Sequence, residues 1–243
     1  MPITYSFFSH PGKNKKQNED ALSILKTEDG LLIAVCDGIG GTTNSHIAAQ
    51  ICADSIKTFF SNTKNQNILK RIKDSINSVN HNIFKYSVET DLDNKISTTA
   101  DVVFVNENFA YWGHVGDSRI YHYKNNTLHR MTKDHSIVQK LIDEGFLKMS
   151  DADNHHTRNM IYSAVGESRK LKIDLSKLKL NSNDLHFFLL CTDGVTSAIS
   201  DEEISEAFSL NDPQTISDYL EIKLKKRNPI DDFSLVVVRI DKH

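Results

Sequence analysis

The segment LLIAVCDGIGG, from Leu31 to Gly41, joins an apolar run to a carboxylate and three glycines. Six apolar residues are enough for one buried strand. Asp37 follows the run directly, and three of the next four residues are glycine. Because a simple turn needs only one or two glycines, the segment indicates an acid held at the rim of a sheet for a further purpose.

Acidic residues recur at the ends of predicted strands. They are Glu19, Asp20, Asp37, Asp117, Asp193 and Asp231. A single Asp-Gly pair is usually only a turn, but repetition of the pattern favours a shared site, although spacing alone does not show that the acids meet. Clustered carboxylates repel one another, and cations that prefer oxygen ligands, such as Mg²⁺ or Mn²⁺, relieve this repulsion.

Length and composition predict an ordinary globular protein. The chain has 243 residues, 39% of them hydrophobic, which suits one large domain with a core, and we expect a single domain over residues 1–243. The net charge of -3 argues against nucleic-acid binding. No apolar segment approaches ~20 residues, and no signal-peptide pattern is present. We therefore expect a cytoplasmic monomer that binds no membrane.

Hydrophobic periodicity predicts an α+β chain with two sheets in its middle. Strands are expected at 21–25, 31–36, 101–106, 109–114, 119–123, 127–131, 186–191 and 233–240. Helices are expected at 45–60, 69–86, 135–144, 201–209 and 213–226. The helix at 69–86 is the clearest, because its apolar residues alternate at spacings of three and four. Residues 146–165 are polar and predict a surface excursion.

The motifs taken together resemble a known family. In chain order they are Asn18-Glu19-Asp20-Ala21, Val35-Cys36-Asp37-Gly38-Ile39-Gly40-Gly41, Thr98-Thr99, His114-Val115-Gly116-Asp117-Ser118-Arg119, Thr132-Lys133-Asp134-His135-Ser136, Arg158-Asn159, Ala164-Val165-Gly166, Leu190-Cys191-Thr192-Asp193-Gly194 and Asp231-Asp232. This ordered set resembles the metal-dependent serine/threonine phosphatases of the protein phosphatase 2C type, in their compact bacterial form. Each motif is weak alone, but the order is specific and covers nearly the whole chain.

The resemblance implies a fold and a metal centre. The fold would be a four-layer α/β/β/α sandwich of two antiparallel sheets flanked by helices, with residues 146–165 as a flap beside the site. Two tight sites and a third, weaker one would hold Mn²⁺ or Mg²⁺. The implied metal-binding residues are Glu19, Asp20, Asp37, Gly38, Asp117, Asp193 and Asp231, with Asp37 bridging two metals and Asp117 serving the third. A water that bridges two metals would be the nucleophile, so no covalent catalytic residue is expected.

Two departures from the family pattern concern charged residues near the site. Lys15 occupies the position where the family usually has an arginine that grips the substrate phosphate, and Asp232 occupies that of an asparagine. Lysine keeps the charge but loses the bidentate fork. We expect Lys15, and Arg158 in the flap, to contact the substrate phosphate. We also expect Lys15→Ala to alter substrate binding more than metal binding.

The function implied is hydrolysis of phosphoserine and phosphothreonine in proteins. The partners would be phosphorylated proteins and an opposing serine/threonine kinase. A non-catalytic module of the same fold that binds phosphoproteins is an alternative, although the intact acidic set argues against it. A hydrolase of small phosphate esters is a second alternative, and the sequence leaves it open.

Overall fold

The computed structural model describes residues 3–39, 44–63, 67–90, 96–152, 154–167, 170–181 and 183–241. Gly40 and Gly41, at the end of the segment quoted above, lie outside the described residues. Within these ranges no helix is both long enough and apolar enough to cross a membrane.

Two antiparallel sheets form the centre of the molecule. The first sheet has the order β1-β11-β10-β7-β8. Its strands are β1 (Ile3–His10), β7 (Arg119–Lys124), β8 (Thr127–Arg130), β10 (His186–Cys191) and β11 (Phe233–Ile240). The strand β11 lies inside this sheet, which explains its continuous run of buried apolar residues.

The second sheet has the order β2-β3-β5-β6-β9, and a short strand, β4, also pairs with β3. Its strands are β2 (Asp20–Thr27), β3 (Gly30–Ile39), β4 (Ser97–Thr98), β5 (Ala100–Val105), β6 (Phe109–Val115) and β9 (Asp174–Lys179). The strand β3 is longer than predicted because Gly38 and Ile39 pair with β4. Asp37 therefore lies within a strand rather than after one.

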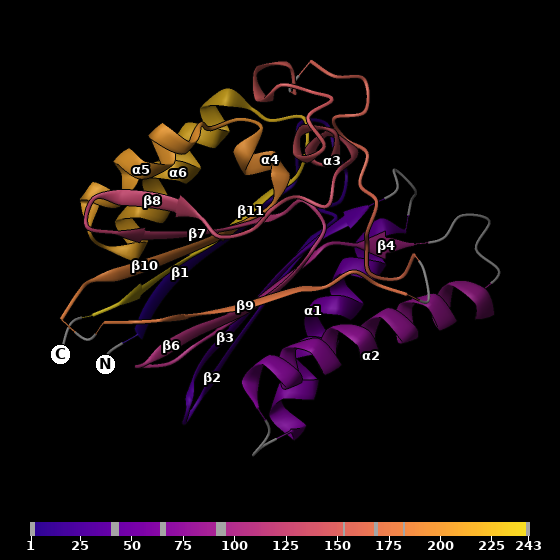
Figure 1. Cartoon of the computed structure of the whole chain (residues 1–243), viewed down its shortest axis with the longest axis horizontal. Helices are drawn as coiled ribbons and strands as arrows, with labels where there is room; N and C mark the ends of the chain where they lie inside the picture. The colour runs from indigo at the N-terminus through magenta and orange to yellow at the C-terminus, as the bar shows by residue number, and fades with distance from the viewer. Residues whose placement is uncertain are drawn as a thin grey trace.

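Helices cover the outer faces of both sheets (Figure 1). Their bounds are α1 (Ser45–Asn62), α2 (Ile68–Glu89), α3 (Ile137–Asp143), α4 (Asp193–Thr196), α5 (Asp201–Ala207) and α6 (Pro213–Arg227), with 3₁₀ turns η1 (Met149–Asp151) and η2 (Phe208–Leu210). The pair α1 and α2 packs on the second sheet, and α4, α5 and α6 pack on the first. The predicted four-layer α/β/β/α sandwich is confirmed.

The apolar stripe predicted on the second helix faces its sheet. Ile72, Ile76, Val79 and Ile83 are buried there in one cluster with residues of β3 and β5. A second cluster lies under α5 and α6, and a third fills the space between the sheets. Burial of these side chains stabilises the sandwich by about 1.5–3 kcal/mol for each large residue.

Three strands were not predicted, the short strand β4 and the strands β1 and β9, which lie at sheet edges. The strand β9 reads DLSKLK, whose polar residues follow no period of two, because only one neighbour pairs with it. The strand β1 likewise has one partner, β11. The predicted helix at 135–144 begins later, at Ile137, because the Ser136 side chain caps it by accepting from the N–H of Gln139.

Candidate metal centre

The β2–β3 hairpin brings the first acids together. Its tight turn sets a register in which Asp20 lies directly opposite Asp37. The Gly38 N–H donates to the Glu19 carbonyl oxygen at 3.1 Å, which ties the residues flanking this pair to each other. One hairpin therefore supplies four of the predicted metal-binding residues.

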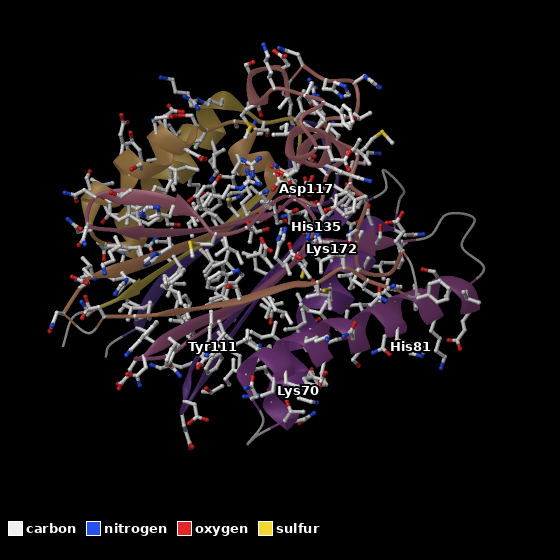
Figure 2. The ribbon with its side chains drawn as sticks, in the orientation of Figure 1. Lys70, His81, Tyr111, Asp117, His135 and Lys172 are labelled. Atoms are coloured by element: carbon white, nitrogen blue, oxygen red, sulfur yellow. The ribbon has the colours of Figure 1, made fainter. Side chains whose placement is uncertain are left out.

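Three further acids reach the same place from other elements. Asp117 lies in the loop between β6 and β7, near the upper edge of the sheets in Figure 2. Asp193 is the first residue of α4, and Asp231 lies just before β11. Burial and then the charges of Asp20, Asp193, Asp117 and Asp231 raise the pKa of Asp37 well above its ordinary value. The structure thus brings five carboxylates within electrostatic range of one another.

Burial and mutual repulsion raise the pKa values of Asp20, Asp117 and Asp193 as well as that of Asp37. Burial raises the pKa of Asp20 to about 8, with the charge of Asp193 adding to the rise. Burial raises the pKa of Asp117 to about 7, again with Asp193 contributing. The pKa of Asp193 rises to about 6, although its hydrogen bond to Asp37 opposes the rise. In the metal-free protein several of these groups consequently hold protons near neutral pH.

The residues present fit a cation with oxygen ligands. The buried Oδ1 atoms of Asp20 and Asp193 have no hydrogen-bond partner among the described residues, and such buried acceptors are costly unless something binds them. At Gly38 a Cβ atom would lie 2.5 Å from the Ser45 carbonyl oxygen and 2.7 Å from that of Glu19, so the backbone here has room only for glycine. Carboxylate and carbonyl oxygens are the ligands that Mg²⁺ and Mn²⁺ prefer.

Two of the predicted metal-binding acids, Glu19 and Asp231, are paired with Lys15. In the described part of the chain, no three His, Cys, Asp or Glu side chains are placed to hold a metal ion as they stand. The Lys15 ammonium donates to Glu19 Oε2 at 3.1 Å, to Asp231 Oδ1 and to Asp232 Oδ2 at 3.1 Å. Burial lowers the pKa of Lys15, but these carboxylates outweigh it and raise the pKa overall. The Lys15 ammonium group and a cation bound by Glu19 or Asp231 would therefore compete for the same carboxylates.

Two threonines hold the acidic strands in place, and sequence reasoning assigned them no role. The Asp37 N–H donates to Thr99 Oγ1 at 2.9 Å, and Thr192 Oγ1 donates to Asp20 Oδ2 at 3.0 Å. Both threonines occur in the motifs quoted above. Both threonines lie next to the ends of predicted strands, and this position was the sequence signal that could have identified them.

Two histidines near the centre are held by hydrogen bonds to neighbouring parts of the fold. Both ring nitrogens of His114 lie within hydrogen-bond distance of oxygens, Asp101 Oδ1 at 2.6 Å and the Lys133 carbonyl oxygen at 2.8 Å, an arrangement that favours the positively charged ring. Burial lowers the pKa of His114, but Asp101 outweighs it and raises the pKa overall. The backbone N–H of His135 donates to the Gly116 carbonyl oxygen at 2.7 Å. This hydrogen bond stabilises the loop that carries Asp117, which lies close to His135 (Figure 2).

The excursion at 146–165 contains the remaining predicted site residue, Arg158. Its N–H donates to the His155 carbonyl oxygen at 3.1 Å within a turn. The end of the excursion is fixed to the domain, because Ile161 forms a β-bridge with Ser136 and Val165 forms one with Thr98. The contact of Arg158 with a substrate phosphate stays a prediction.

Comparison with known proteins decides the family. The family model described as Protein phosphatase 2C matches residues 9–221 of the chain. The chain belongs to the protein phosphatase 2C family. This result confirms the resemblance drawn from the ordered motifs, and with it the predicted class of enzyme, a protein phosphatase.

Relatives from several bacteria share both sequence and fold. The serine/threonine phosphatase stp of Listeria monocytogenes is 28% identical over 228 residues, which cover 91% of this chain and 88% of that protein. The structure of serine/threonine phosphatase Stp1 from Staphylococcus aureus is 25% identical with a TM-score of 0.91, covering 99% of this chain and 96% of that one. The catalytic domain of the phosphatase PstP, in complex with two manganese ions, is 25% identical with a TM-score of 0.84 and covers 98% and 99%.

Proposed function

We propose that this 2C-type phosphatase hydrolyses phosphoserine and phosphothreonine in proteins and depends on Mn²⁺ or Mg²⁺. The observation that carries the proposal is the convergence of five carboxylates at one edge of the sheets, where burial and neighbouring charges raise the pKa values of Asp37, Asp20, Asp117 and Asp193. The names of the Listeria and Staphylococcus relatives support the substrate class, and the two manganese ions of the PstP structure support the cofactor.

The acids would divide between two tight sites and one weaker site. We assign Asp37 as the bridging ligand, with Asp193, Asp231 and the Gly38 carbonyl at the first site. Glu19 and Asp20 would serve the second site, and Asp117 the third. When bound, such ions supply an activated water for attack on phosphorus, and they offset the charge of the phosphoryl oxygens.

The other residues would position the acids and the substrate. Thr99 and Thr192 hold the strand ends that carry Asp37 and Asp20. Lys15 and Arg158 would contact the substrate phosphate, where lysine acts as a point charge and arginine can bind with two N–H groups. The proposal includes no covalent phosphoenzyme. Phosphoproteins would be the substrates of a cytoplasmic, monomeric enzyme that opposes a serine/threonine kinase.

One assay tests this proposal against its alternatives. Phosphate release is measured from a phosphothreonine peptide and from an aryl phosphate, with Mn²⁺ and with a chelator. We expect turnover of the peptide with Mn²⁺, none with the chelator, and none for Asp193→Ala. Activity that survives chelation contradicts metal dependence, and release from the aryl phosphate alone favours a hydrolase of small esters. No release from either compound, together with binding of the phosphopeptide, favours a non-catalytic module.

A further inference from the structure

The Lys15 side chain occupies the acidic centre itself. Its Nζ atom contacts one oxygen of each of three carboxylates, those of Glu19, Asp231 and Asp232. Two of these, Glu19 and Asp231, are assigned above as metal ligands. We propose that Lys15 is a built-in counter-ion, which neutralises this part of the centre in the metal-free protein and must leave when a divalent cation binds. The inference rests on the proposed function, because it concerns the same metal centre.

Asp232 holds the ammonium group in this place. Its carboxylate is 2% exposed and accepts three hydrogen bonds, from the Gly12 N–H at 2.7 Å, the Glu19 N–H at 2.7 Å and Lys15 Nζ at 3.1 Å. The loop before β2 is therefore fastened to the start of β11 through one buried side chain. An asparagine here would lack the charge that pairs with a lysine, so Lys15 and Asp232 form a matched pair.

The exchange follows from the charges that would meet at the same carboxylates. Glu19 Oε2 and Asp231 Oδ1 each accept a hydrogen bond from the ammonium group, so a divalent cation bound by these carboxylates would lie beside a second positive charge. The two positive charges would repel one another at this distance. A lysine can move away without a change of the backbone, because its charge sits on a flexible four-carbon stem.

This arrangement changes an expectation drawn from the sequence. There, Lys15→Ala was expected to affect substrate binding more than metal binding. The contacts with Glu19 and Asp231 lead us to expect a clear effect on metal affinity as well. Release of the ammonium group on metal binding also frees it for the phosphate contact assigned above, so one residue serves both states.

Mn²⁺ binding to the metal-free full chain tests the inference directly. Isothermal titration calorimetry compares wild type with Lys15→Met and with a matched control, Lys16→Met, which removes the same charge from an exposed position of the same loop. We expect Lys15→Met to bind Mn²⁺ about tenfold more tightly, because the competing charge is gone, and the control to match wild type. We also expect Lys15→Met alone to lower the melting temperature of the metal-free protein, and saturating Mn²⁺ to remove that difference.

Each outcome separates the inference from the proposed function. Normal Mn²⁺ binding by wild type, with equal or weaker binding by Lys15→Met, overturns the counter-ion role and leaves the phosphatase proposal standing. Absence of Mn²⁺ binding by wild type overturns both. If Lys15→Met fails to fold, Lys15→Gln replaces it, because the amide can still donate to the carboxylates without a charge. The same gain in affinity for Lys15→Gln supports the inference, and an unchanged affinity overturns it.

Discussion

The substitution Asp193→Asn should stabilise the metal-free protein. Asp193 lies among four other carboxylates, and its Oδ1 atom is buried without a hydrogen-bond partner among the described residues. Asparagine has nearly the same shape but no charge, and its amide can donate to Asp37. The substitution therefore removes a repulsive charge without opening a cavity, while it also removes a proposed metal ligand and should abolish turnover.

The size of the effect follows from the pKa of Asp193, which rises from an ordinary value of 3.8 to about 6. At ~1.4 kcal/mol per pKa unit, the ionised group lowers the free energy of unfolding by about 3 kcal/mol once the pH is well above 6. An acid with a raised folded pKa binds its proton more tightly in the native state, so this penalty is absent below pH 3.8 and grows as the pH rises. At pH 5 it is roughly half as large.

Thermal unfolding in a chelator, at pH 8 and at pH 5, measures this effect. We expect Asp193→Asn to raise the melting temperature by about 5–10 °C at pH 8 and by clearly less at pH 5. Asp54→Asn, on the exposed face of α1, is the matched control and should change little at either pH. A variant that is no more stable than wild type at pH 8, or equally stabilised at both pH values, would refute the reasoning.

Three further substitutions test other parts of the centre. Asp117→Ala should lower kcat while calorimetry still finds two tightly bound Mn²⁺ ions. An unchanged kcat would contradict a role for Asp117 in a third metal site needed for turnover. Gly38→Ala should lower the free energy of unfolding, measured by chemical denaturation, by about 1–3 kcal/mol and should weaken Mn²⁺ binding, because the added Cβ would lie 2.5 Å from the Ser45 carbonyl oxygen. Asp101→Asn should lower the free energy of unfolding by about 3–5 kcal/mol, because it leaves the buried charge of His114 without its carboxylate partner. Since the pKa of His114 is raised in the fold, this last loss should be greatest below pH 6.5 and should shrink as the pH rises; a loss independent of pH contradicts it.

Periodicity predicted those elements whose environment is uniform along their length. The helix α2 was found because one stripe of its residues faces the sheet throughout. The edge strand β9 was missed because pairing on one side leaves much of its surface to solvent, and its sequence reads as a polar loop. The extension of β3 beyond Asp37 depends on its pairing with β4, a contact between distant segments that no local pattern reports.

Part of the metal centre was accessible to sequence reasoning and part was not. The pairing of Asp20 with Asp37 follows from the tight turn between their strands, since a turn sets the register of a hairpin. The arrival of Asp231 beside Lys15 does not, because 216 residues separate the two. The ordered family motifs indicated instead that Asp231 belongs to the metal centre. For the position of Lys15 they implied a phosphate-binding role, and they did not indicate that its ammonium group contacts Glu19 and Asp231.

The same charges that weaken the metal-free fold provide the affinity for a cation. Burial raises the pKa values of Asp20, Asp37 and Asp193, so each contributes a cost to folding near neutral pH. The chain tolerates this cost because protons held by acids with raised pKa values, and the ammonium group of Lys15, offset negative charge. Binding of divalent cations would release both, so the affinity for metal should rise with pH and should depend on how firmly Asp232 retains the lysine.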